Sequence, residues 1–188
     1  MISSDNHIIT SRIKEDTGVD INLCYQCGKC TAGCVLADDM DYPSSYIMRL
    51  LQTNEEESYR KVLSSNAIWI CVNCENCIGR CPKEVDIPVV MDYLRSQSHS
   101  QGLVSPKAKP IIAFYKSFLG TVKYTGRLNE VFMTVAYKLH TFHLWQDVKL
   151  VPSMLAKGKL KFWPETIKNK KEISEIFQKS QTVKKSEL

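Results

Sequence analysis

Every cysteine of this 188-residue chain falls in one of two runs that share a single spacing. The first run is Cys24, Cys27, Cys30 and Cys34, and the second is Cys71, Cys74, Cys77 and Cys81, followed by Pro82. Both runs read C-x2-C-x2-C-x3-C, so the chain contains an internal duplication of one binding element. Thiolates at this spacing are typical ligands of [4Fe–4S] clusters. The sequence therefore predicts two [4Fe–4S] clusters, with electron transfer as their chemistry.

The spacing also predicts which cysteines share a cluster. Three thiolates separated by two residues each let one tight loop reach three irons, whereas the fourth cysteine points away and ligates the other cluster, as in two-cluster bacterial ferredoxins. This crossed pattern ties the two runs together, so metal insertion and folding should be coupled. The predicted ligand sets are Cys24, Cys27, Cys30 and Cys81 for one cluster, and Cys71, Cys74, Cys77 and Cys34 for the other.

Two other uses of cysteine compete with this interpretation. Structural zinc often takes paired C-x2-C elements, but usually as two separated pairs and not as two runs of four. Disulfides need an oxidising compartment, which nothing in the sequence indicates. A zinc-stabilised interaction or nucleic-acid module is therefore the less favoured alternative, with residues 157–188 as its basic surface, since they hold nine Lys against four Glu. A solvated tail explains those lysines more simply, and we expect no nucleic-acid partner.

The elements around the cysteines are predicted to be helical, because apolar residues recur at helical spacing and no convincing strand alternation occurs. Only Ile68-Trp69-Ile70 is ambiguous. The expected fold is all-α. We expect an α-helical ferredoxin-like domain at 1–102, a helical arm for partner docking at 103–165 and a basic tail at 166–188. The expected elements are helices at 11–16, from 44, from 55 and after Pro88, a stripe from Ile111 to Phe118 ended by Gly120, a stripe from Leu128 to Phe142, and a turn at 152–156.

Membrane and secretory signals are not expected in this chain. No apolar run approaches the roughly 18 residues of a membrane span. The N-terminal residues carry no basic segment followed by an apolar stretch, so the expected compartment is the cytoplasm.

The strings around the cysteines narrow the family. The segment Cys24-Tyr25-Gln26-Cys27-Gly28-Lys29-Cys30-Thr31-Ala32-Gly33-Cys34 resembles the first cluster motif of the iron–sulfur C-type subunits of heterodisulfide reductase, and residues 71–82 resemble their second. Two downstream elements, Gly126-Arg127-Leu128 and Gly158-Lys159-Leu160 before Trp163-Pro164, are also similar to that family. The resemblance spans roughly residues 10–165.

The resemblance implies a role in a cytoplasmic complex of methanogenesis. There, a flavin-containing, electron-bifurcating A-type subunit passes electrons through the C-type subunit to a catalytic B-type subunit, which reduces the mixed disulfide of coenzyme M and coenzyme B. An associated hydrogenase or formate dehydrogenase completes the expected partners. This chain has no Cys-Cys pair and no Gly-rich dinucleotide fingerprint, so we expect no catalytic residue on it and a purely electron-transferring part in the oxidoreductase. The alternative is an iron–sulfur subunit of another redox complex, such as a sulfur-oxidising or membrane-associated reductase.

Overall fold

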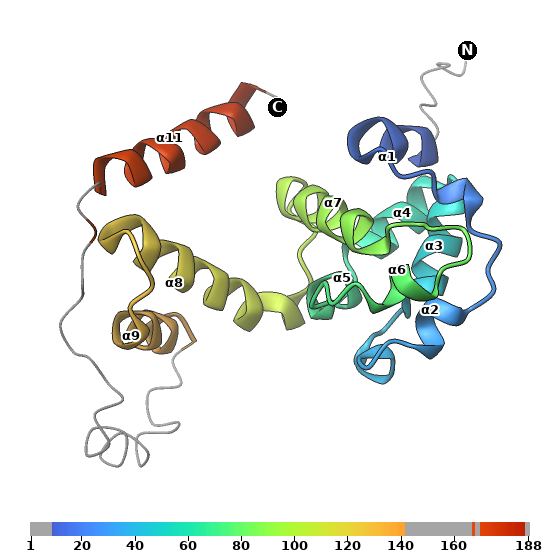
Figure 1. The fold of residues 1–188 in the computed structure, drawn as a ribbon, viewed down its shortest axis with the longest axis horizontal. Coiled ribbons are helices and arrows are strands. Elements are labelled where there is room, and N and C mark those ends of the chain that lie inside the picture. Colours follow the sequence, from blue (N-terminus) through green and yellow to red (C-terminus); the bar gives the residue numbers. More distant parts are fainter. Residues whose placement is uncertain (1–8, 142–166, 168–169, 187–188) are drawn as a thin grey trace. The chain divides into compact units, whose positions relative to one another are not determined.

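The computed structural model describes residues 9–141, 167 and 170–186, and all regular structure in them is helical (Figure 1). No strand occurs in these residues, so the all-α prediction is confirmed. The chain divides into two compact units, Met1–Lys109 and Pro110–Leu188, each described here by itself. The elements of the first unit are α1 (Ile9–Thr17), η1 (Ile21–Leu23), α2 (Lys29–Ala32), η2 (Ala37–Asp39), α3 (Ser44–Gln52), α4 (Glu56–Leu63), α5 (Ala67–Ile70), α6 (Asn76–Arg80), α7 (Ile87–Ser100) and η3 (Pro106–Ala108).

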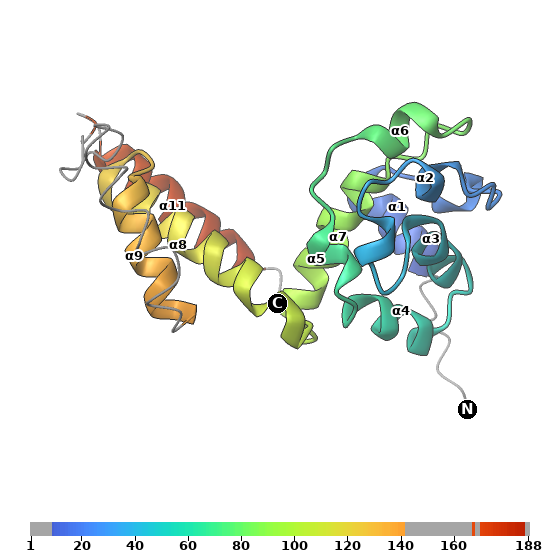
Figure 2. The same ribbon diagram turned by 90° about the horizontal axis from the view of Figure 1, so that it is seen from below.

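Four helices, α1, α3, α4 and α7, build the core of the first unit by packing against one another (Figure 2). Helices α3, α4 and α7 contribute the apolar stripes that the sequence predicted, because side chains three and four residues apart share one helix face, and α1 adds Ile9 and Ile13. The largest fully buried side chains include Ile13, Ile47, Leu51, Tyr59, Leu63, Met91 and Leu94. Cys30, on α2, is buried with this core, and the other cysteines lie on α6 and on the loops around the core.

Local signals set the ends of these helices. Helix α1 ends before Gly18, whose φ of 76° is a left-handed conformation that glycine adopts without strain. Helix α7 begins after Asp86, whose carboxylate accepts a hydrogen bond from the backbone N–H of Val89 at 3.2 Å. Pro88 fits the first turn of α7, where a missing N–H is tolerated. The ends of α7 and α1 are therefore encoded locally.

Each cysteine run contains one short helix that sequence reasoning missed. Helix α2 carries Cys30 and α6 carries Cys77, and the two helices pack against each other. With four and five residues they are too short to show helical periodicity. The ambiguous segment Ile68-Trp69-Ile70 is also helical, as α5, whose last residue immediately precedes Cys71.

The second unit contains α8 (Lys109–Thr125), α9 (Glu130–Thr141) and α11 (Lys170–Ser186). Gly120 was expected to end α8, but the helix runs on to Thr125 and stops before Gly126, whose φ is 80°. An interior glycine costs a helix only about 1 kcal/mol, so Gly120 does not break it. Phe142 and the expected turn at 152–156 lie outside the described residues. None of the described helices is long and apolar enough to cross a membrane.

Candidate metal centres

Two open cavities lie in the first unit, and four cysteines line each of them. The first cavity is lined by Cys24, Cys27, Cys30 and Cys81, and the second cavity by Cys34, Cys71, Cys74 and Cys77. Their empty space is about 360 and 410 Å³, part of it open to solvent. Each cavity therefore gathers three cysteines from one run and the fourth from the other. This grouping supports the crossed ligand assignment, which stays a prediction until the ligands are tested.

The donor set of each cavity fits a cubane cluster. In a [4Fe–4S] cluster each thiolate binds a different iron, so the four sulfurs surround the group from several sides. A single zinc ion would instead draw its ligands to one point, about 2.3 Å from each sulfur. In the described part of the chain, no three cysteine, histidine or carboxylate side chains converge on such a point. Apolar residues complete the walls, and Ile87, at the start of α7, lines both cavities.

A glutamine on α3 holds the loop of the first run. The Nε2 atom of Gln52 donates to the backbone carbonyls of Ile21 and Cys24, at 3.0 and 2.7 Å. Its Oε1 atom accepts from Nε2 of Gln26 at 3.0 Å, and the same Nε2 of Gln26 lies 3.5 Å from the sulfur of Cys24. Gln52 thus fixes both the backbone of Cys24 and the amide beside its sulfur.

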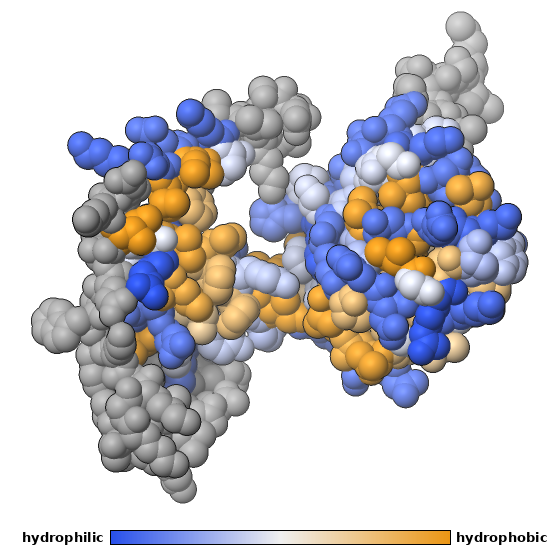
Figure 3. All heavy atoms as spheres, viewed as in Figure 1, coloured by the Kyte–Doolittle hydropathy of each residue, from blue (hydrophilic) through white to orange (hydrophobic). Residues whose placement is uncertain are grey.

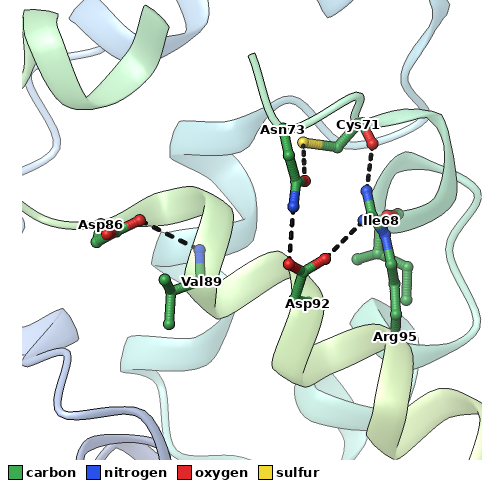
Figure 4. Close-up of polar contacts among 7 residues, drawn as sticks. All are labelled: Ile68, Cys71, Asn73, Asp86, Val89, Asp92 and Arg95. Atoms are coloured by element: carbon green, nitrogen blue, oxygen red, sulfur yellow. Dashed lines mark hydrogen bonds and ion pairs between the residues drawn. The ribbon is translucent and has the colours of Figure 1, made fainter. Parts of the chain in front are cut away.

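An arginine on α7 occupies the corresponding place in the second run (Figure 4). Arg95 donates to the carbonyls of Ile68 and Cys71, which are 47 positions after Ile21 and Cys24. It also pairs with Asp92, whose carboxylate lies 2.7 Å from the guanidinium. Two unrelated side chains from two helices therefore make the same pair of backbone contacts.

Asp92 carries the contact onward to the amide beside Cys71. Its Oδ2 atom accepts from Nδ2 of Asn73 at 2.8 Å, so the other end of that amide, Oδ1, faces the sulfur of Cys71 at 3.5 Å (Figure 4). Asn73 is the counterpart of Gln26 in the duplicated run. The two sulfurs therefore meet opposite ends of equivalent amides.

The two loops also share a backbone conformation that side chains rarely adopt. Gln26 and Asn73 have φ of 63° and 49°, and Gly28 and Glu75, at the next equivalent position, have φ of 75° and 62°. Left-handed backbone at a residue other than glycine costs of order 1–3 kcal/mol and is typical of functional sites. Its recurrence at matched positions shows that the two runs form loops of the same shape.

Burial and hydrogen bonding change the thiol pKa values in different directions. Burial raises the pKa of Cys30, and burial with the neighbouring Cys71 raises the pKa of Cys77 to about 11. The backbone N–H of Lys29 lowers the pKa of Cys27, assisted by the Tyr25 hydroxyl and the Lys29 charge and opposed by slight burial. Among these three thiols, Cys27 is the one whose surroundings favour the thiolate.

Polar contacts also join the two runs directly. Nδ2 of Asn76 donates to the carbonyl of Gly33 at 2.6 Å, and the Arg80 side chain lies across Gly33, where a Cβ atom would clash with it. The Thr31 hydroxyl bonds the Ser45 hydroxyl at 2.8 Å and so ties the first run to α3. Side-chain contacts therefore tie the two runs to each other and the first run to α3.

The comparisons with known proteins bear on this pair of cavities. Residues 20–85 match the 4Fe-4S dicluster domain. All eight cysteines lie inside this match, and the prediction of two [4Fe–4S] clusters is confirmed. The chain is an iron–sulfur protein.

The resemblance to the C-type subunits of heterodisulfide reductase is also confirmed by curated relatives. The chain is 29% identical over 105 residues to the C subunit of the H2:CoB-CoM heterodisulfide,ferredoxin reductase of Methanothermobacter thermautotrophicus, covering 56% of this chain and 55% of the relative. It is 35% identical over 92 residues to the C subunit of the ferredoxin:CoB-CoM heterodisulfide reductase of Methanosarcina acetivorans, covering 49% and 35%. The match thus spans about half the length of the first of these relatives.

A relative from another complex is also similar. The iron–sulfur subunit of the 8-methylmenaquinol:fumarate reductase of Wolinella succinogenes is 31% identical over 121 residues, covering 57% of this chain and 36% of the relative. The chain is therefore similar to relatives with different named reactions, which bears on the choice of function below.

Sequence reasoning found all eight cysteines but missed the side chains that hold them. Gln52 and Arg95 lie on helices far from the motifs, and their polar groups resemble ordinary surface positions. Spacing alone gives no signal for such contacts. The duplication does give a signal, because a donor to the carbonyls of one run predicts a donor to the equivalent carbonyls of the other run.

Proposed function

We propose that this chain is an iron–sulfur electron-transfer subunit of a heterodisulfide reductase complex in the cytoplasm. It relays electrons from a flavin-containing, electron-bifurcating A-type subunit to a B-type subunit that reduces the mixed disulfide of coenzyme M and coenzyme B. The two clusters would supply one-electron transfer when bound. The chain's own residues hold them at fixed places, through the cysteines and the Gln52 and Arg95 contacts.

The observation that carries the proposal is the pairing of two four-cysteine cavities in one small unit that is similar to curated C-type subunits. Adjacent clusters bound by one rigid unit form a path for electrons but offer no place for a substrate. The amide side chains beside the sulfurs, Gln26 and Asn73, are already hydrogen-bonded to Gln52 and Asp92. We assign none of these side chains a catalytic role.

The second unit supplies the proposed docking arm. Helices α8 and α9 expose large apolar side chains, and Figure 3 shows apolar surface along α8. A single exposed apolar residue is ordinary, but a run of them over two helices is typical of an interaction surface. On α8 and α9 the exposed residues are Phe114, Tyr115, Leu119, Tyr124, Phe132, Val135 and Leu139, and Leu128 lies between the two helices.

Anaerobic copurification from the native host, with identification of the neighbouring subunits, tests the proposal. The expected result is a brown complex containing A-type and B-type subunits, with about eight irons on this chain. A truncation after Lys109 tests the arm, because Ala108 is fully buried in the first unit and should be kept. The truncated chain should keep its clusters and fail to assemble. Normal assembly of the truncated chain would count decisively against the docking arm.

A second candidate function rests on the fumarate reductase relative. In that case the chain would be the iron–sulfur subunit of a different reductase and would have a different catalytic partner. The same copurification separates the two candidates, because the catalytic neighbour would then be a fumarate reductase-like subunit. A colourless chain with stoichiometric zinc would falsify both.

A further inference from the structure

The duplicated loops allow the two clusters to be compared atom by atom. Both loops place an amide side chain two residues after their first cysteine, at a left-handed backbone position, with one end of the amide 3.5 Å from that cysteine's sulfur. Gln26 presents nitrogen to Cys24, and Asn73 presents oxygen to Cys71. The scaffold is therefore matched, and the atom facing the sulfur is the difference.

The amide of Gln26 is oriented by its neighbour. Gln52 uses Nε2 on two carbonyls, so its Oε1 atom can only accept, and it accepts from Gln26. Turning the Gln26 amide would let it donate to the Ser45 carbonyl at 2.9 Å and accept from the backbone N–H of Arg49 at 3.3 Å, but would bring its oxygen to 3.0 Å from Oε1 of Gln52 and aim it at Cys24. A metal-bound thiolate only accepts hydrogen bonds, so nitrogen toward the sulfur is the favoured orientation.

The amide of Asn73 is held the other way by charge. Asp92, which is paired with Arg95, accepts from Nδ2 of Asn73. Turning this amide to donate to Cys71 would place its oxygen against the carboxylate. A thiol at Cys71 can donate to Oδ1, but a metal-bound thiolate has no proton to give. The sulfur of Cys71 therefore faces an acceptor.

We infer that the first-cavity cluster has the higher reduction potential, and that the opposed amides of Gln26 and Asn73 set much of the difference. Hydrogen bonds to the sulfurs and nearby charge are among the main factors that tune such potentials. A donor stabilises the extra negative charge of the reduced state, and an acceptor opposes it.

One further difference acts in the same direction. The first run carries Gly28 and Lys29 where the second carries Glu75 and Asn76, so at these two adjacent positions the first loop has one positive charge and the second loop has one negative charge.

The order of the two reduction potentials gives the direction of electron transfer between the clusters. If the chain is the electron relay proposed above, on which this step rests, electrons leave the second-cavity cluster for the first-cavity cluster. The donor subunit then docks beside Cys34 and Cys74, and the acceptor subunit beside Cys27. The potentials themselves are a property of this chain and can be measured without partners.

Two glycine variants of the full chain test the inference, read by EPR during an anaerobic redox titration. Glycine suits the left-handed backbone at both positions, so Gln26→Gly and Asn73→Gly remove the amides without adding strain. Gln26→Gly should lower the higher of the two midpoints. Asn73→Gly should raise the lower one. The opposite signs of these two shifts are the signature of opposed amides.

Asp92→Asn gives a third test, because without the carboxylate Asn73 can turn its nitrogen to the sulfur, and the lower midpoint should rise. Glu57→Gln, the same charge loss at an exposed site on α4, should leave both midpoints unchanged. Glycine shifts of the same sign, or a Gln26→Gly shift in the lower midpoint, would overturn the inference. Iron analysis distinguishes a failure of this inference from a failure of the proposed function. A chain that binds no iron would overturn both. A chain with about eight irons in which Gln26→Gly shifts the lower midpoint and Asn73→Gly the higher one would overturn the inference alone.

Discussion

The two cysteine runs share their spacing, their left-handed loop positions and a donor on the same pair of carbonyls, yet the donor is a neutral amide in one run and a guanidinium in the other. Gln52 reaches the first loop from α3, and Arg95 reaches the second from α7. The duplication therefore preserved the geometry that the clusters require, while the surrounding helices supplied it by different chemistry. The comparison teaches that the cysteine spacing specifies the shape of each loop, whereas the side chains of the surrounding helices specify the electrostatics around its sulfurs.

The largest expected effect comes from breaking the exchange of fourth ligands between the runs. If Cys34 serves the second cavity, Cys34→Ser with Cys71→Ser should perturb one cluster, and Cys34→Ser with Cys24→Ser should perturb both. Serine oxygen can still bind iron weakly, so a shifted potential or a three-iron form counts as perturbation. EPR during a redox titration measures the outcome. A single perturbed cluster in the Cys34 and Cys24 pair would show that each run holds its own.

The crossed grouping was accessible from the sequence because cysteine spacing constrains geometry directly. The helices of the first unit were accessible for a similar reason, since stripes such as Ile47, Leu50 and Leu51 report burial. The short helices α2 and α6 were not, because their shape follows from the loops and not from any periodic pattern. The end of α8 was misplaced because Gly120 tolerates a helix, whereas Gly126 requires a left-handed turn. The limits 103–165 and 166–188 for the arm and the tail stay predictions.

The donors Gln52 and Arg95 were invisible to sequence reasoning, and their removal gives the next largest effect. Hydrogen bonds to charged groups contribute about 1.5–3 kcal/mol and neutral ones about 0.5–1.5 kcal/mol. Arg95→Met also removes the ion pair with Asp92, so it should destabilise the second loop more than Gln52→Met destabilises the first. Bleaching of cluster absorption in dilute denaturant should accelerate on the order of tenfold for Arg95→Met.

The control for the arginine variant is Arg49→Met on α3, where the side chain is exposed. It should leave the bleaching rate unchanged. Equal rates for the Gln52 and Arg95 variants would show that the charge adds nothing to the backbone contact, and the contrast between the two loops would then be confined to their amides.

A smaller effect distinguishes the elements that lead into each run. Asp41 accepts from the backbone N–H groups of Asn66 and Ala67 at 2.9 and 2.8 Å, and so holds the start of α5 from 25 residues away. Asp20 caps η1 locally, through the N–H of Asn22 at 3.0 Å. Asp41→Ala should cost about 1–2 kcal/mol, because two N–H groups lose their acceptor, and Asp20→Ala less. The rates at which cluster absorption bleaches in the two variants, measured under identical conditions, check this order. Faster bleaching of Asp20→Ala than of Asp41→Ala would contradict it.

The smallest expected effect concerns the residue directly after the first cysteine of each run. Tyr25 lies at the rim of the first cavity, and the hydrogen bond between its hydroxyl and Cys27 raises the pKa of Tyr25. Val72, its counterpart at the second cavity, offers no hydrogen bond from its side chain. Tyr25→Phe should therefore lower the first-cavity midpoint. The shift should be smaller than that of Gln26→Gly, because Tyr25 is 56% exposed and water can replace its hydroxyl. Val72→Ile, the matched change at the other rim, should move neither midpoint in the same titration. A Tyr25→Phe shift confined to the second-cavity cluster would mean that the hydroxyl acts across the unit, and the two rims could no longer be treated as independent.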